Sequence, residues 1–129
     1  MLEDIAVVRR GYDAFNAGDL AALNELIAED AVWHTPGHGV LAGDSVGRVA
    51  IIARLGRSTV ESEGTFEVRL KRVLTDEDGR LIGIHHTVAK RRGRLLDAYG
   101  CIVFELGEGR ILDAREHLLD LAAWDAFWS

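Results

Sequence analysis

Cysteine, proline and methionine occur once each among the 129 residues, and acidic residues outnumber basic ones. The lone Cys101 has no partner for an intramolecular disulfide, which favours a reducing compartment. No apolar run approaches the ~18 residues that span a bilayer, and the N-terminus lacks a basic-then-apolar leader. We therefore expect a cytoplasmic protein with no membrane partner. The net charge of −6 argues against a nucleic-acid partner, because phosphate backbones bind basic surfaces.

The residues that are present fit one folded domain over residues 1–129. Apolar residues make up 48% of the chain and charged residues 28%, which is the balance of a globular protein rather than a disordered one. A chain of this length buries a core without disulfides. No internal repeat or low-complexity segment divides it.

Apolar spacings of three and four residues predict three helices before the main run of strands. The first covers residues 3–17. Asp19 caps the second, which ends near Glu29. The third covers residues 46–57, with its apolar face at Val46, Val49, Ala50 and Ala53, and with Ile52 as a further candidate for this face.

A short strand from Ala31 to Thr35 follows the second helix and ends at Pro36, because proline cannot donate to a strand ladder. Four further strands are predicted over residues 65–75, 81–91, 95–106 and 110–119, separated by turn sequences. Asp120 caps a short closing helix that carries Trp124, Phe127 and Trp128. Helices followed by an antiparallel meander predict an α+β domain, with the helices on one face of a curved sheet.

Alternation along the strands assigns the side chains to two faces of this sheet. A turn at Arg92-Gly93 places His85 on the helix-facing, inner face. The same register adds Ala98, Gly100, Ile102, Phe104, Leu106, Leu112, Ala114, Glu116 and Leu118. Small residues on this face, together with Gly11 and the Trp33 and Thr35 side of the short strand, leave space that either stays open as an internal cavity or is filled by larger helix side chains.

Glu116 lies between apolar neighbours on the inner face, where an ionised carboxylate must be paired, solvated or protonated. His85 is its nearest expected partner, with Thr87 and Thr35 as further hydrogen-bonding groups. A carboxylate and an imidazole in an apolar pocket favour acid–base catalysis. The alternative is a buried pair that only sets the strand register. No spacing of His, Cys, Asp and Glu predicts a metal site, and we expect no cofactor.

Two amphipathic helices, the segment Trp33-His34-Thr35-Pro36-Gly37, a glycine loop, a third helix and a meander resemble the nuclear transport factor 2-like superfamily. The resemblance is to its SnoaL-like branch, which contains polyketide cyclases and relatives of ketosteroid isomerase. It implies a cone-shaped sheet wrapped around the N-terminal helices and enclosing a ligand pocket. The implied pocket residues are Gly11, Phe15, Trp33, Thr35, Thr87, Gly100, Ile102, Ala114 and Leu118.

The catalytic positions of ketosteroid isomerase fall at Gly11, Thr35 and Ile102, so its residues are missing here, and Tyr12 beside Gly11 is expected to point elsewhere. An arginine is also missing from the inner face, unlike in the limonene epoxide hydrolase branch. The cyclase branch matches best, with Glu116 as base and His85 as its orienting partner or acid. The expected function is cofactor-independent, cyclase- or isomerase-like catalysis on a small, mainly apolar molecule. The alternative is a carrier that binds such a molecule without converting it, or an accessory domain with a filled core.

The outer face of the sheet carries an apolar patch formed by Ile84, Val88, Tyr99, Cys101 and Val103. Exposed patches of this kind mark interfaces, and the resembled family often dimerises sheet to sheet. We expect a homodimer through this face, with His86 and Arg115 near the two-fold axis. The alternative is that the closing helix covers the patch, although we expect that helix to close the pocket.

Overall fold

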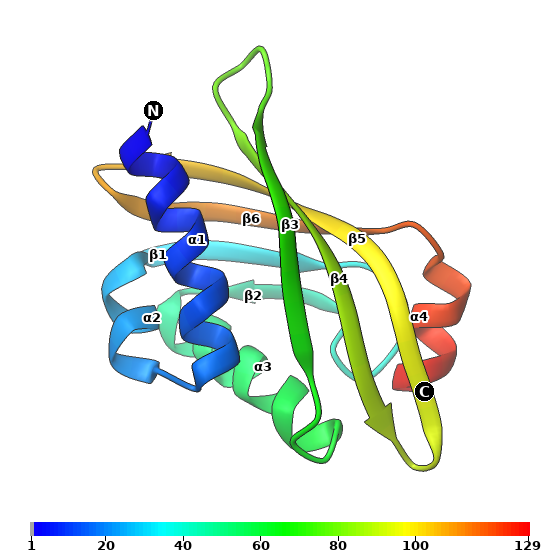
Figure 1. The fold of residues 1–129 in the computed structure, drawn as a ribbon. Coiled ribbons are helices and arrows are strands. Elements are labelled where there is room, and N and C mark those ends of the chain that lie inside the picture. The colour runs from blue at the N-terminus through cyan, green and yellow to red at the C-terminus, as the bar shows by residue number, and fades with distance from the viewer. Residues whose placement is uncertain (1) are drawn as a thin grey trace.

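The computed structural model describes residues 2–129 as one curved six-stranded sheet with helices on its concave side (Figure 1). The helices are α1 (Leu2–Ala17), α2 (Leu20–Leu26), α3 (Arg48–Glu61) and α4 (Leu121–Trp128). The strands are β1 (Ile27–Thr35), β2 (Gly43–Val46), β3 (Glu67–Thr75), β4 (Leu81–Arg91), β5 (Arg94–Gly107) and β6 (Arg110–Leu118). This architecture confirms the predicted α+β cone. Within the described residues, no helix is both long and apolar enough to cross a membrane.

The strand order β2-β1-β6-β5-β4-β3 brings the first strand beside the last. β1 and β6 are parallel, whereas all other neighbours are antiparallel. The antiparallel pairs from β3 to β6 join strands that are consecutive in the chain, as a meander requires. The β1–β6 pairing sets Trp33 opposite Ala114, so β1 lies inside the sheet, between β2 and β6.

The predicted hairpin register between β4 and β5 is confirmed. His85 lies opposite Gly100, Thr87 opposite Ala98 and Gly83 opposite Ile102. Arg92 and Gly93 both have positive φ, as a two-residue hairpin turn requires. Leu112, however, was wrongly placed on the inner face. The register shifts between Glu105 and Leu106, so Leu112 is 43% exposed while its neighbour Ile111 is buried.

Two helix predictions were wrong in their bounds. α2 ends at Leu26 rather than near Glu29, because the chain becomes extended at Ile27 and enters β1. Ile27 and Ala28 are buried there as strand residues. The third helix begins at Arg48, because the unexpected strand β2 pairs with β1 as far as Val46. Its buried residues are Ile51, Leu55 and Ser58, whereas Val49 is 85% exposed. The spacing was helical, but the apolar face had been assigned to the wrong side of the helix.

α4 closes the inner side of the sheet, as expected, and does not cover the outer patch. Trp124, Phe127 and Trp128 form one buried cluster with residues of the glycine loop and of the inner face, namely Leu41, Ala89, Leu96 and Ala98. The loop contacts the helix closely, since Val40 N donates to the carbonyl of Trp128 at 3.2 Å. On the outer face, Tyr99 remains 51% exposed and stacks on the ring of His86.

Candidate functional site

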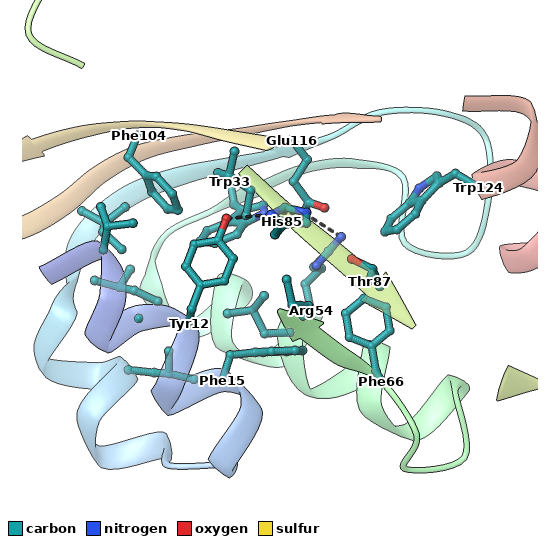
Figure 2. A pocket seen from close by; sticks show the side chains of 18 residues that line it. Tyr12, Phe15, Trp33, Arg54, Phe66, His85, Thr87, Phe104, Glu116 and Trp124 are labelled. Atoms are coloured by element: carbon teal, nitrogen blue, oxygen red, sulfur yellow. Dashed lines mark hydrogen bonds and ion pairs between the residues drawn. The ribbon is translucent and has the colours of Figure 1, made fainter. Parts of the chain in front are cut away.

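A cavity of about 60 Å³ lies between the helices and the inner face of the sheet (Figure 2). Its volume is several times the ~10–15 Å³ that one water molecule needs, so it has room for a few non-hydrogen atoms. A larger ligand requires the side chains around it to move. Most of the wall is apolar and aromatic, which is typical of small-molecule sites.

Seven of the predicted site residues line this cavity: His85, Glu116, Gly11, Phe15, Trp33, Thr87 and Ile102. Four others do not. Thr35 is buried behind Glu116, Ala114 is fully buried, and Leu118 packs against the α4 cluster. Gly100 leaves space for backbone rather than for a ligand, because a Cβ there would lie 2.6 Å from the carbonyl oxygen of His117.

Glu116 is held at one oxygen and left free at the other. Its Oε2 accepts hydrogen bonds from Trp33 Nε1 at 2.6 Å and from the Thr35 hydroxyl at 3.3 Å. Arg54 Nη2 lies 2.8 Å from the same oxygen. Within residues 2–129, Oε1 has no hydrogen bond, so one carboxylate oxygen is fixed in place and the other can react.

Arg54 is the residue that sequence reasoning missed. It reaches from α3 across the cavity to Glu116 (Figure 2). The signal was present, since Arg54 lies three residues after Ile51 and one before Leu55, on the buried side of α3. Because the predicted apolar face lay on the other side of this helix, Arg54 was not expected to be buried. A buried arginine pairs its charge with the equally buried carboxylate, which lowers the cost of keeping either one ionised.

His85 is not the partner of Glu116, because no hydrogen bond joins the two side chains in the described part of the chain. Its Nδ1 lies 2.7 Å from the hydroxyl of Tyr12, which also lines the cavity. The expectation that Tyr12 points elsewhere was therefore wrong. Gly83 makes this pair possible, because a Cβ there would lie 2.6 Å from the Tyr12 hydroxyl. The cavity thus has two polar pairs, Glu116 with Arg54 and His85 with Tyr12.

Both members of the second pair are uncharged at neutral pH. Burial lowers the pKa of His85 to about 4, and the negative charge of Glu116 opposes this only in part. Burial, with a contribution from the charge of Glu116, raises the pKa of the Tyr12 hydroxyl far above its usual range. His85 and Tyr12 can therefore donate or accept hydrogen bonds without adding charge to the cavity.

The lowered pKa of His85 predicts a loss of stability in mild acid. In the unfolded chain His85 has a pKa near 6.5, so the unfolded state takes up a proton first as the pH falls. The contribution is complete above about pH 6.5 and is lost progressively down to about pH 4. Between pH 7 and pH 4.5, the wild type should lose about 2–3 kcal/mol more unfolding free energy than His85→Gln, as measured by urea denaturation. Parallel pH profiles for the two proteins would contradict this assignment.

No group of three or more His, Cys, Asp or Glu side chains within residues 2–129 is arranged to hold a metal ion. The chemistry that these residues themselves offer is proton transfer. A carboxylate oxygen and a neutral imidazole–tyrosine pair face the same apolar space. An apolar surrounding strengthens the electrostatic interactions of each polar group that reaches a ligand.

Comparison with known proteins identifies relatives over nearly the whole chain. Residues 8–114 match the model of the SnoaL-like domain family. An uncharacterised protein of Mycobacterium tuberculosis is 36% identical over 126 residues, which cover 98% of this chain and 96% of the relative. Bal32a, from a soil-derived mobile gene cassette, is 53% identical, with a TM-score of 0.95 over 98% of this chain and 97% of its own.

A more distant structure, IdmH of Streptomyces antibioticus, is a candidate polyketide cyclase. It is 19% identical, with a TM-score of 0.74 over 94% of this chain and 97% of its own. At this identity the similarity establishes a shared fold.

Proposed function

This chain belongs to the SnoaL-like domain family, and we propose that it catalyses cyclase- or isomerase-type proton transfer on a small, mainly apolar molecule. Glu116 is the proposed base. The pair formed by His85 and Tyr12 is the proposed donor of a hydrogen bond or proton to the same molecule. The occurrence of a candidate polyketide cyclase among proteins of this fold supports this class of reaction.

The observation that carries the proposal is the asymmetry of the Glu116 carboxylate. Trp33 and Thr35 donate hydrogen bonds to Oε2 and Arg54 forms an ion pair with it, whereas Oε1 receives no hydrogen bond from the described residues and belongs to a side chain that lines the cavity. A carboxylate that served only to fix the strand register would be expected to have both oxygens satisfied. A base needs the opposite arrangement, with one oxygen positioned and the other open to the substrate.

Exchange of carbon-bound protons with D₂O, followed by NMR, tests the proposal directly. A panel of polyketide-like, terpenoid and steroid ketones offers protons that a base can remove without a complete reaction. We expect enzyme-dependent exchange for at least one compound. Tight binding of panel members with no exchange and no turnover would instead favour a carrier, and a protein that binds none of them would favour an accessory domain.

We also propose that the protein is a homodimer through the outer face of the sheet. Ile84, Val88, Cys101 and Val103 are only half-buried there and Tyr99 is exposed, while α4 packs on the opposite side. A two-fold axis near His86 and Arg115 would let the patch meet its own copy. Light scattering at micromolar concentration should give twice the 14.2 kDa of one chain. A mass of one chain would contradict the dimer, and Tyr99→Glu should convert a dimer to that mass.

A further inference from the structure

Arg54 has buried hydrogen-bond donors that the protein does not use. Only 10% of its side chain is exposed, yet its Nε and Nη2 atoms have no hydrogen-bond partner among residues 2–129. The 2.8 Å contact from Nη2 to Glu116 Oε2 is an ion pair, but its geometry is not that of a hydrogen bond. Buried donors without acceptors are rare, because they lose water without gaining a replacement.

None of the polar groups that line the cavity with Arg54 accepts a hydrogen bond from its Nε or Nη2 in the described part of the chain. Leu55, Phe66, Val68 and Trp124 are among the apolar and aromatic residues of the wall. The Tyr12 hydroxyl is occupied by His85, and Glu116 Oε2 already accepts from Trp33 and Thr35. These donors lie on the wall of the cavity, so a molecule that enters the cavity can supply the missing acceptor.

We propose that Arg54 is the binding subsite for an acceptor oxygen, and that the ligand is an uncharged, mainly apolar molecule with a carbonyl group. This rests on the proposed function, since it names the class of molecule that the same site converts. The carbonyl oxygen accepts from the Nε–H and Nη2–H of Arg54, and the apolar remainder lies between the aromatic side chains, which move apart to admit it. Guanidinium groups suit this role because they present several donors in one rigid plane.

The balance of charge in the cavity selects an uncharged ligand over an anion. Arg54 and Glu116 are the two charged side chains among its lining residues, and they are of opposite sign. A carboxylate ligand would add a second negative charge beside Glu116 in an apolar space, which is costly. A carbonyl adds none. When Glu116 Oε1 takes a proton from the neighbouring carbon, the electron pair of the broken bond moves to the carbonyl oxygen, where Arg54 compensates the charge.

Three compounds of similar size and shape separate the possibilities. Acetophenone carries a neutral acceptor oxygen, ethylbenzene carries none, and benzoate carries a charged one. In NMR titrations of the ¹⁵N-labelled protein, acetophenone should bind about tenfold or more tighter than ethylbenzene, because its oxygen receives a hydrogen bond from a charged donor. Benzoate should bind no tighter than ethylbenzene. The Arg54 Nε–H resonance should move with acetophenone and stay in place with ethylbenzene.

The variants are built on Glu116→Gln, because removing Arg54 alone would leave a buried carboxylate without its counter-charge. Arg54→Met in this background should abolish the preference for acetophenone over ethylbenzene while changing the affinity for ethylbenzene less than twofold. Arg57→Met is the matched control, since Arg57 is exposed on the same helix. It should change neither affinity.

Three results would overturn the inference: equal binding of acetophenone and ethylbenzene by the wild type, tighter binding of benzoate than of acetophenone, or a preference that persists without Arg54. If the double variant does not fold, the Arg54 resonance of the wild type still decides the matter. All of these are equilibrium measurements. Failure of proton exchange with an intact acetophenone preference would therefore remove the proposed catalysis and leave the subsite standing.

Discussion

Glu116→Gln is expected to lower turnover and proton exchange by about two to four orders of magnitude, the usual contribution of a positioned general base. Glutamine has the same shape, and its amide oxygen can take the hydrogen bonds that Trp33 and Thr35 donate to Oε2. The amide has no basic oxygen to accept a proton from the substrate. Ligand affinity should therefore be largely retained, so that kcat falls and KM changes little.

Glu105→Gln provides the control for this substitution. Glu105 is an exposed residue of β5, so the same chemical change there should leave both constants unaltered. Full activity of Glu116→Gln would exclude Glu116 as the base. His85 would then be the remaining group on the cavity wall able to accept a proton at neutral pH, since its imidazole is neutral.

Trp128→Ala is expected to be the most destabilising single substitution in the C-terminal part of the chain, costing about 3–5 kcal/mol of unfolding free energy. Trp128 is fully buried and contacts the rings of Trp124, Phe127 and Phe66. Its Nε1 has no hydrogen-bond partner among the described residues, so alanine removes an unsatisfied donor as well. That gain offsets part of the lost packing and favours the lower end of the range. Urea denaturation followed by circular dichroism measures the difference.

Trp128→Phe separates packing from the buried N–H group. Phenylalanine keeps most of the ring contacts and removes the unpaired donor, so its cost should stay below about 1.5 kcal/mol. Leu119→Ala is the exposed control, because Leu119 is 85% exposed and should change stability by less than about 0.5 kcal/mol. A Trp128→Ala protein as stable as this control would mean that α4 is not anchored by its aromatic cluster.

Anchoring of α4 also matters for the cavity, because Trp124 on the same helix is part of its wall. Arg91 secures the end of this helix from the sheet, donating to the carbonyls of Phe127 at 3.3 Å and Ser129 at 2.6 Å while pairing with Glu61. The loop after β1 packs directly against α4 at Gly39. A Cβ at this position would lie 2.6 Å from Trp128 Cβ, so only glycine fits without displacing the helix. A substitution that loosens α4 should therefore weaken ligand binding as well as stability.

Local patterns in the chain were enough to predict that the helices exist, to set the register of the β4–β5 hairpin and to place His85 and Glu116 on the inner face of the sheet. The register of β4 and β5 depends on a turn at Arg92 and Gly93 that lies between the strands it joins. Alternation then carries His85 and Glu116 to the same side. These features follow from the sequence because each depends on residues close to one another in the chain.

Contacts between distant segments decided the rest. β2 pairs with β1 up to Val46, so α3 begins at Arg48, and the packing of α3 on the sheet brings Arg54 to Glu116. Tyr12 and His85 are 73 residues apart, and Trp33 and Glu116 are 83 apart. Neither pairing has a local signature, because each depends on how α1 and β1 pack against the curved sheet. The chain alone therefore indicated which carboxylate and which imidazole face the cavity, and the tertiary structure assigned the partner of each.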